Sequence, residues 1–202
     1  SNSMIFGFAR NLLLTLGLLT GLSASDIAGA DVTHSPWGLG MLMHERAEIL
    51  GDRAAFQETR ILQMMRKPLE VSGELVYRAP DYLRKTVVEP EFEEMEVIGQ
   101  RLYLGDWESR RRLHIDQHPA LAGMVAAILG TLSGDLVSLE NYFEHAFNGT
   151  QSAWRLNLTP RSIEVAEYIK AVTIEGEGSR LLRVETLYAN GDISLMQMQS
   201  ME

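Results

Sequence analysis

The sequence predicts a mainly β protein of the α+β class, a curled antiparallel half-open β-barrel of about ten strands with a helical lid. Short segments alternate apolar and polar residues, most strictly from Leu69 to Tyr77, which is the period of a half-buried strand. Turn residues such as Gly99-Gln100 and Asn190-Gly191-Asp192 join these segments in hairpin order. One long uncharged segment, Ala120 to Ser133, has helical spacing instead.

The expected elements follow one another in a simple order. Between Trp37 and Leu50 apolar residues recur at helical spacing, and Gly51 ends this first helix. Strand patterns then cover residues 54–62, 69–77, 82–88, 92–98, 101–104 and 109–115. After His118-Pro119 the period becomes helical over residues 120–133, and a second short helix covers 135–140. Strand patterns return over residues 141–147, 152–158, 168–174, 180–188 and 193–199. Because few helices separate the strands, the sheet is expected to be antiparallel rather than parallel.

Charge and composition exclude several classes of function. The chain has 202 residues and a formal net charge of -9, which argues against nucleic acid as a partner and against adsorption to an anionic membrane through a basic face. It contains no cysteine. Disulfides, thiolate nucleophiles, thiolate metal sites and lipid attachment through cysteine are therefore excluded.

The N-terminal segment is expected to be an export signal rather than part of the fold. Residues 1–3 resemble a cloning remnant, and residues 4–30 resemble a signal peptide. Residues 11–25 carry no charge, are too few for a comfortable membrane span of about 20 apolar residues, and precede the small residues Ala28-Gly29-Ala30. We expect cleavage after Ala30, which leaves residues 31–202 as a single domain in the periplasm. An uncleaved anchor is the alternative.

No arrangement of residues predicts catalysis or a metal site. His114 and His118 straddle a strand end and a loop beside Pro119, so solvated loop histidines fit this spacing better than metal ligands do. Ser133 with His114 is the one pair to check for a lipid hydrolase, but Ser133 lacks the Gly-x-Ser-x-Gly elbow. We therefore expect no enzymatic activity, no metal and no cofactor.

Apolar side chains at alternate positions of successive strands are expected to face one concave side of the sheet. Leu182 and Val184 are two such positions. The residues expected to line an acyl-chain cavity are Leu75, Tyr77, Leu83, Val97, Leu102, Trp154, Leu156 and Met196. The residues of the uncharged helix expected to face inward as a lid are Leu121, Met124, Val125 and Ile128. A filled barrel core produces the same strand pattern, and the uncharged helix favours a lid over a cavity.

Two stretches have the motifs of a known family. They are Gly73-Glu74-Leu75-Val76-Tyr77-Arg78-Ala79-Pro80-Asp81-Tyr82-Leu83 and Trp154-Arg155-Leu156-Asn157-Leu158-Thr159-Pro160. With Phe56-Gln57 before them and the hairpin around Gly191-Asp192 after them, the chain resembles the periplasmic outer-membrane lipoprotein carrier (LolA) family, in its diverged LolA-like branch. The resemblance implies a half-open antiparallel barrel, closed by a helical lid over an apolar cavity, without enzymatic activity.

The resemblance also implies cargo, partners and a latch. Family members take acylated cargo from an inner-membrane release complex to an outer-membrane receptor. In the carrier proper, a basic residue directly before the proline holds the lid, whereas Ala79 stands at that place here. Arg78 and Arg84 are the candidate replacements, although one step along a strand reverses the face of a side chain. The family's receptor has a lipidated cysteine, so the lack of cysteine favours the shuttle.

These expectations combine into one functional hypothesis. The protein is expected to be a soluble periplasmic carrier that shields the acyl chains of a lipoprotein or lipid in an apolar cavity during transfer to the outer membrane. The alternative is a non-catalytic periplasmic assembly or structural β-domain with a filled core and a partner-binding edge. Where the segment Leu12 to Leu22 is ordered, we expect it to pack as a helix against the lid or cavity, in the place of cargo.

Overall fold

The computed structural model describes residues 37–106 and 108–201. The expected cloning remnant, signal peptide, cleavage site and Leu12 to Leu22 helix lie outside these residues. Over the two described ranges, no helix has the length and apolar character needed to cross a membrane.

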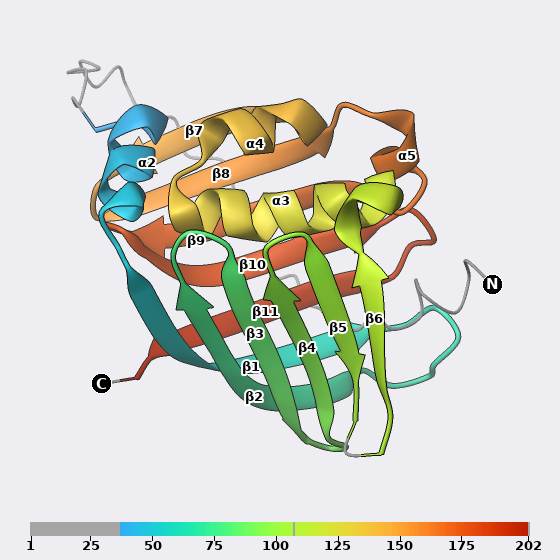
Figure 1. Cartoon of the computed structure of the whole chain (residues 1–202). Helices are drawn as coiled ribbons and strands as arrows, with labels where there is room; N and C mark the ends of the chain where they lie inside the picture. The colour runs from blue at the N-terminus through green and yellow to red at the C-terminus, as the bar shows by residue number, and fades with distance from the viewer. Residues whose placement is uncertain (1–36, 107, 202) are drawn as a thin grey trace, which may run out of the picture.

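One antiparallel sheet of eleven strands dominates the described part of the chain (Figure 1). The strands are β1 (Gly51–Ile61), β2 (Leu69–Arg78), β3 (Tyr82–Glu89), β4 (Glu93–Ile98), β5 (Arg101–Gly105), β6 (Arg110–His114), β7 (Phe143–Thr150), β8 (Ala153–Pro160), β9 (Ile169–Glu177), β10 (Arg180–Tyr188) and β11 (Ile193–Ser200). Their order is β6-β5-β4-β3-β2-β1-β11-β10-β9-β8-β7, so β6 and β7 are the two edges and the sheet does not close on itself. The predicted curled, half-open antiparallel fold is confirmed, with eleven strands instead of about ten.

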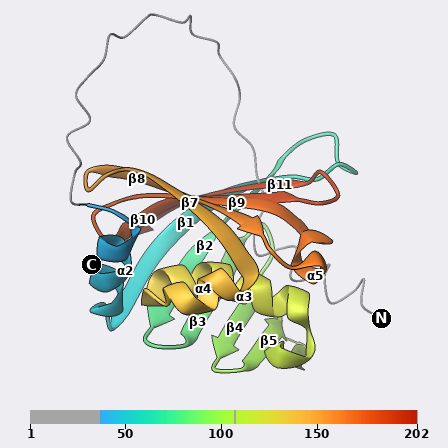
Figure 2. The same cartoon turned by 90° about the horizontal axis from the view of Figure 1, so that it is seen from above.

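The first and last strands join two meanders at the centre of the sheet. β1 pairs with β2 on one side and with β11 on the other, and every neighbouring pair is antiparallel. One half therefore contains β2 to β6 and the other contains β7 to β11. Both halves curl toward the helices, which lie between them in Figure 2.

Four α-helices accompany the sheet in the described residues: α2 (Leu39–Ala47), α3 (Pro119–Ser133), α4 (Leu136–Tyr142) and α5 (Ile163–Ala166), with a 3₁₀ turn at Ile115–Gln117. Pro119 begins α3, and Gly134 ends it in the left-handed conformation at φ 70°, both common positions for these residues. Asp135 then caps α4 by accepting a hydrogen bond from the backbone N–H of Ser138. The four-residue α5 is too short for periodicity to predict, and only its cap, Ser162, follows a helix-start pattern.

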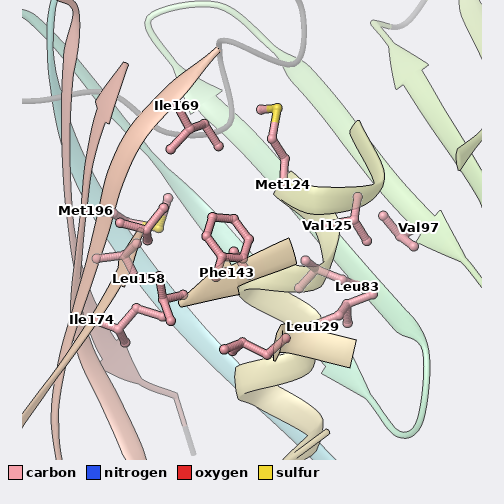
Figure 3. Packing of buried hydrophobic residues seen from close by; sticks show 14 of the residues in the cluster. Leu83, Val97, Met124, Val125, Leu129, Phe143, Leu158, Ile169, Ile174 and Met196 are labelled. Carbon is pink, nitrogen blue, oxygen red and sulfur yellow. The ribbon is translucent and has the colours of Figure 1, made fainter. Parts of the chain in front are cut away.

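Helix α3 is buried on nearly every side within the curl of the sheet. Its buried residues include Leu121, Met124, Ala127 and Leu129, and Figure 3 shows it between side chains of both halves of the sheet. On its other sides it packs against α2, α4 and α5. A Cβ at Gly123 would overlap the side chain of Val165 from α5, so this close approach requires glycine. The lack of charge in α3 follows from this burial, because a charged side chain here would lose its hydration.

We predict that Gly73→Ala destabilises the fold where β2 meets β3. The added Cβ would overlap the carbonyl oxygen of Thr86 and lie 2.9 Å from a ring carbon of Phe56, so the sheet would have to shift. Urea denaturation should show a loss of about 1–3 kcal/mol in the free energy of unfolding.

Gly40→Ala is the matched control, because nothing lies within 4 Å of a Cβ at this position in α2. This substitution should leave stability unchanged or raise it by up to about 1 kcal/mol, since alanine favours a helix. Equal destabilisation by both substitutions would contradict the close packing at Gly73.

Candidate functional site

A small apolar pocket opens between the two halves of the sheet, at the end of the barrel near α2. Four of the eight predicted cavity residues line it: Leu75, Tyr77, Leu83 and Met196. From the other half come Leu181, Val184 and Met198, while Ile128 and Leu132 of α3 close the pocket from within the curl. Ala54 and the polar residues Asp52, Arg53, Arg180 and Ser200 complete its lining.

The other four predicted cavity residues are buried in the continuous apolar core. Leu102 and Leu156 are fully buried. Val97 pairs with Leu83 on one side and with Leu102 on the other, so Leu83, Val97 and Leu102 form one row across β3, β4 and β5. Trp154 stacks on Phe147, with 6.1 Å between ring centroids, and its indole N–H donates to the carbonyl oxygen of Gly178 at 2.8 Å. The eight residues therefore share one concave face, and four of them line this pocket.

The pocket is too small for an acyl chain in this form of the protein. Its volume is about 50 Å³. A water molecule occupies about 30 Å³, and pockets for small-molecule ligands are usually about 300–1,000 Å³. Most of the space inside the curl is filled by α3. Binding a long acyl chain on this face would therefore require α3 to move.

The predicted lid residues lie along one face of α3 and differ in how deeply they are buried. Leu121 and Met124 are each 1% exposed, and Val125 is buried close to Val97 and Leu83 in Figure 3. Ile128 is only partly buried because it borders the pocket. Helix α3 is thus inserted into the concave face. It lies deeper than the predicted lid, which was expected to cover the mouth of the sheet.

A bulge in β10 changes which leucine faces the pocket. The pairing of β10 with β9 shifts between Leu181 and Arg183. Leu181 therefore lies on the pocket side with Val184, while Leu182 is 36% exposed. Strict alternation placed Leu182 on this face, and that assignment is wrong because the extra residue of a bulge reverses the pattern.

Arg46 connects α2, α3 and the sheet. Its side chain is fully buried, and its Nε donates to the carbonyl oxygen of Leu132 at 2.9 Å, in the last turn of α3. Its Nη1 donates to the carbonyl oxygen of Ser179 at 3.0 Å and to Asp52 Oδ2 at 3.3 Å. A cation at a helix C-terminus also interacts favourably with the helix dipole. Burial lowers the pKa of this guanidinium, and Asp52 opposes that shift.

Arg46, rather than Arg78 or Arg84, is thus the arginine that contacts the lid. Tyr77 and Leu83 face the concave side, so by alternation Arg78 and Arg84 face the convex side, away from α3. The guanidinium of Arg78 lies 5.3 Å from the ring centre of Tyr82, which starts β3. Sequence reasoning missed Arg46 because it looked for the latch in a strand. The nearest signal was a basic residue in the last turn of the first helix.

Three charged residues lie buried on the concave face. Glu58 is fully buried, and Lys85 and Arg60 are 2% and 3% exposed. Glu58 Oε2 accepts hydrogen bonds from Lys85 Nζ at 2.6 Å and from Arg60 Nη2 at 3.2 Å. Lys85 also lies 4.8 Å from the ring centre of Phe56. Burial lowers the pKa of Lys85 to about 8, and the nearby carboxylate of Glu58 opposes this shift. We call these three residues the buried charge cluster.

The structure shows the surroundings of Ser133 and His114, the pair considered for hydrolysis. Ser133 Oγ donates to the carbonyl oxygen of Leu129 at 2.6 Å, as a helical serine commonly does, and His114 is exposed at the end of the edge strand β6. Within the part of the chain that the structure describes, no three His, Asp or Glu residues are grouped to hold a metal ion.

The sequence matches the family described as "Outer membrane lipoprotein carrier protein LolA-like" over residues 38–199. The chain therefore belongs to this family, as the motifs predicted. No curated protein matches the sequence.

Three solved structures are similar to this chain at low identity. A LolA superfamily protein from Nitrosomonas europaea is 11% identical with a TM-score of 0.43, covering 78% of this chain and 90% of that one. A DUF1329 family protein from Desulfovibrio piger is 9% identical, also with a TM-score of 0.43, covering 80% and 88% of the two chains. A chain of the MucA/MucB complex from Pseudomonas aeruginosa is 13% identical with a TM-score of 0.40, covering 79% and 53%. These likenesses are distant, so the family assignment rests on the sequence match.

We predict that Arg46→Leu loosens the C-terminal half of α3. The substitution removes the donors to the carbonyls of Leu132 and Ser179 and leaves Asp52 without this ion pair. Amide hydrogen exchange should accelerate most in residues 129–134, and the free energy of unfolding should fall by about 2–4 kcal/mol.

Arg53→Leu is the control for the loss of one arginine. Arg53 is exposed and pairs with Glu74, and water and salt screen an ion pair in such a position. Its exchange pattern in α3 should match that of the unmodified protein. If amide hydrogen exchange in the Arg46→Leu variant increased uniformly across the sheet, a specific role of Arg46 at α3 would be contradicted.

We also predict a pH dependence of stability that Lys85→Met removes. The pKa of Lys85 is lowered from 10.5 to about 8 in the fold, so between these pH values the unfolded chain binds a proton that the folded protein has released. Stability should therefore rise from pH 8 to pH 10.5, on the order of 2 kcal/mol relative to the variant. Parallel curves of unfolding free energy against pH for both proteins would refute this assignment.

Proposed function

We propose that this LolA-like protein is a periplasmic carrier that shields the acyl chains of a lipoprotein or lipid during transfer to the outer membrane. The observation that supports it most is the position of α3. An uncharged helix occupies the concave apolar face of an open sheet, and the small pocket beside it is lined by apolar residues of both sheet halves. If α3 moved away, this apolar surface would be exposed and could bind an acyl chain, which is also apolar.

The mechanism needs no reacting group. Keeping an acyl chain in water costs about 0.8 kcal/mol for each CH₂ group, so an apolar groove that replaces water binds it strongly. In the closed form, α3 already buries much of this groove. Cargo must therefore displace contacts of Leu121, Met124 and Ile128, which lowers its net affinity and permits release. Loading then exchanges one apolar partner of the sheet for another.

Partners are expected to act through Arg46, which we call the latch because it holds the end of α3. A protein that disturbs Arg46 or the neighbouring turn at Ser179 would free the end of α3 and favour loading. A partner that favours the closed form would expel cargo. We assign these two roles to an inner-membrane release complex and an outer-membrane receptor, the partners that the family resemblance implies.

A structural or assembly role is the competing proposal. The filled interior supports it, as do the edge strands β6 and β7. Among the described residues each of these strands has a neighbour on one side only, so it could accept another strand. This reading predicts that the protein binds a partner chain and no acyl ligand.

Binding of a fluorescent fatty acid to Leu181→Asn and Leu182→Asn separates these proposals. Leu181 lines the pocket, whereas its neighbour Leu182 is exposed, so the two variants differ in which face they change. We expect Leu181→Asn to weaken binding by about tenfold, because an apolar wall is lost and an amide is partly desolvated. Leu182→Asn should bind as the unmodified protein does.

Circular dichroism of both variants establishes that each is folded. Absence of probe binding by the unmodified protein would overturn the carrier proposal. Equal weakening by both variants would place the acyl chain outside the pocket.

A further inference from the structure

The buried charge cluster is continuous with the apolar pocket. Val184 on β10 and Met196 on β11 line the pocket and are directly paired. Thr186 and Ser194 are the next residues on the same face of the same two strands, about 7 Å further along, and they also pair with each other. Ser194 pairs in turn with Arg60 of β1. The concave face therefore changes from apolar to polar within one step of the pocket wall.

Two hydroxyl groups at this step have unused hydrogen-bonding capacity. Thr186 and Ser194 are both fully buried. Within the described residues, neither Thr186 Oγ1 nor Ser194 Oγ has a hydrogen-bond partner. Buried polar groups normally have one, since an unsatisfied group costs about 1–3 kcal/mol. Two adjacent exceptions on the face that would hold cargo indicate a place for a polar group of the ligand.

Two cations and two carboxylates form the charged group next to Ser194. Lys85 and Arg60 converge on one carboxylate oxygen of Glu58. A second carboxylate, Glu93, is one-third exposed and lies 3.9 Å from Arg60 Nη1. Ammonium and guanidinium groups carry several donors each and no acceptor, so each is chemically suited to an anionic oxygen. Hydroxyl donors and two cations together match a carboxylate or phosphate.

We propose that Arg60, Lys85, Ser194 and Thr186 form a site for the anionic head group of an acylated ligand whose chain lies in the adjacent groove. This inference rests on the proposed carrier function and narrows its ligand to an amphiphile with a carboxylate or phosphate next to the acyl chain. Glu58 holds the two cations in place when the ligand is absent, and it competes with the ligand for them when the ligand is bound.

Calorimetry with three ligands of equal chain length tests the site. Dodecanoate carries a carboxylate, dodecyl phosphate carries a phosphate, and dodecanol is the uncharged reference. We expect at least one anionic ligand to bind about tenfold or more tightly than dodecanol, as a charge-assisted hydrogen bond provides. The tighter of the two anions identifies whether the head group is a carboxylate or a phosphate.

Two variants separate head-group binding from structural support. Ser194→Ala with Thr186→Val removes both hydroxyls without changing charge, and it should weaken the favoured anion about fivefold while leaving dodecanol unchanged. Glu58→Gln removes the competing carboxylate and should strengthen binding of that anion by about threefold or more, although it lowers the melting temperature of the free protein. A residue with a purely structural role would produce no such gain. The control Thr173→Val removes a hydroxyl from the convex side of β9, where it donates to Asn157, and should change neither ligand.

Each result decides between the two proposals. Equal affinity for dodecanol and both anions would overturn the head-group site and leave the carrier function intact. Loss of all three ligands in Ser194→Ala with Thr186→Val, or weaker anion binding in Glu58→Gln, would also overturn the site, since the cluster would then only support the fold. Absence of binding by any ligand to the unmodified protein would refute the carrier function and the site together.

Discussion

Mutual burial of α3 and the concave face is the constraint on which the rest of the structure depends. A fifteen-residue helix without charge needs cover on all sides, and an open sheet of eleven strands needs cover on its apolar face. Each satisfies the other, with α2, α4 and α5 covering what the sheet leaves exposed. The glycines at 123 and 134 follow from this packing, because a Cβ at either place would overlap Val165 or the carbonyl of Met43. The function proposed here uses the same constraint, since cargo and α3 require the same surface.

Polar groups determine how such an apolar interface could be opened and what it could accept. Arg46 fixes one end of α3 through the carbonyl of Leu132, so a change at a single buried side chain can alter the whole lid. Further along the groove, Lys85 and Arg60 meet Glu58 in the interior, where ion pairs contribute little net stability because both partners lose hydration. A ligand therefore explains such a cluster better than the stability of the fold does. Arg46 and the buried charge cluster are separate groups of residues, and we propose a separate role for each.

The sequence predicted the features that depend on local periodicity. Alternation from Leu69 to Tyr77, the turn at Gly99-Gln100 and the uncharged segment were sufficient to predict the sheet, its hairpins and the helix α3. The bulge at β10 was not predictable, because the apolar pattern of the sequence does not show where one extra residue is inserted. As a result Leu181, and not Leu182, faces the pocket. Arg46 and the buried charge cluster were also missed. Glu58, Arg60 and Lys85 read as ordinary exposed positions until pairing across β1, β2 and β3 brings them together.

The exchange of α3 for cargo can be measured directly as a distance. The chain has no cysteine, so Gln57→Cys on the exposed side of β1 and Ala126→Cys on α3 provide two unique sites for spin labels. Electron–electron double resonance measures the distance between the two spin labels. Without ligand it should give one short, narrow distance distribution. When dodecanoate, or the ligand that binds most tightly, saturates the protein, the distribution should be longer and broader. An unchanged distance with ligand demonstrably bound would contradict the central claim, because the acyl chain would then bind without displacing α3.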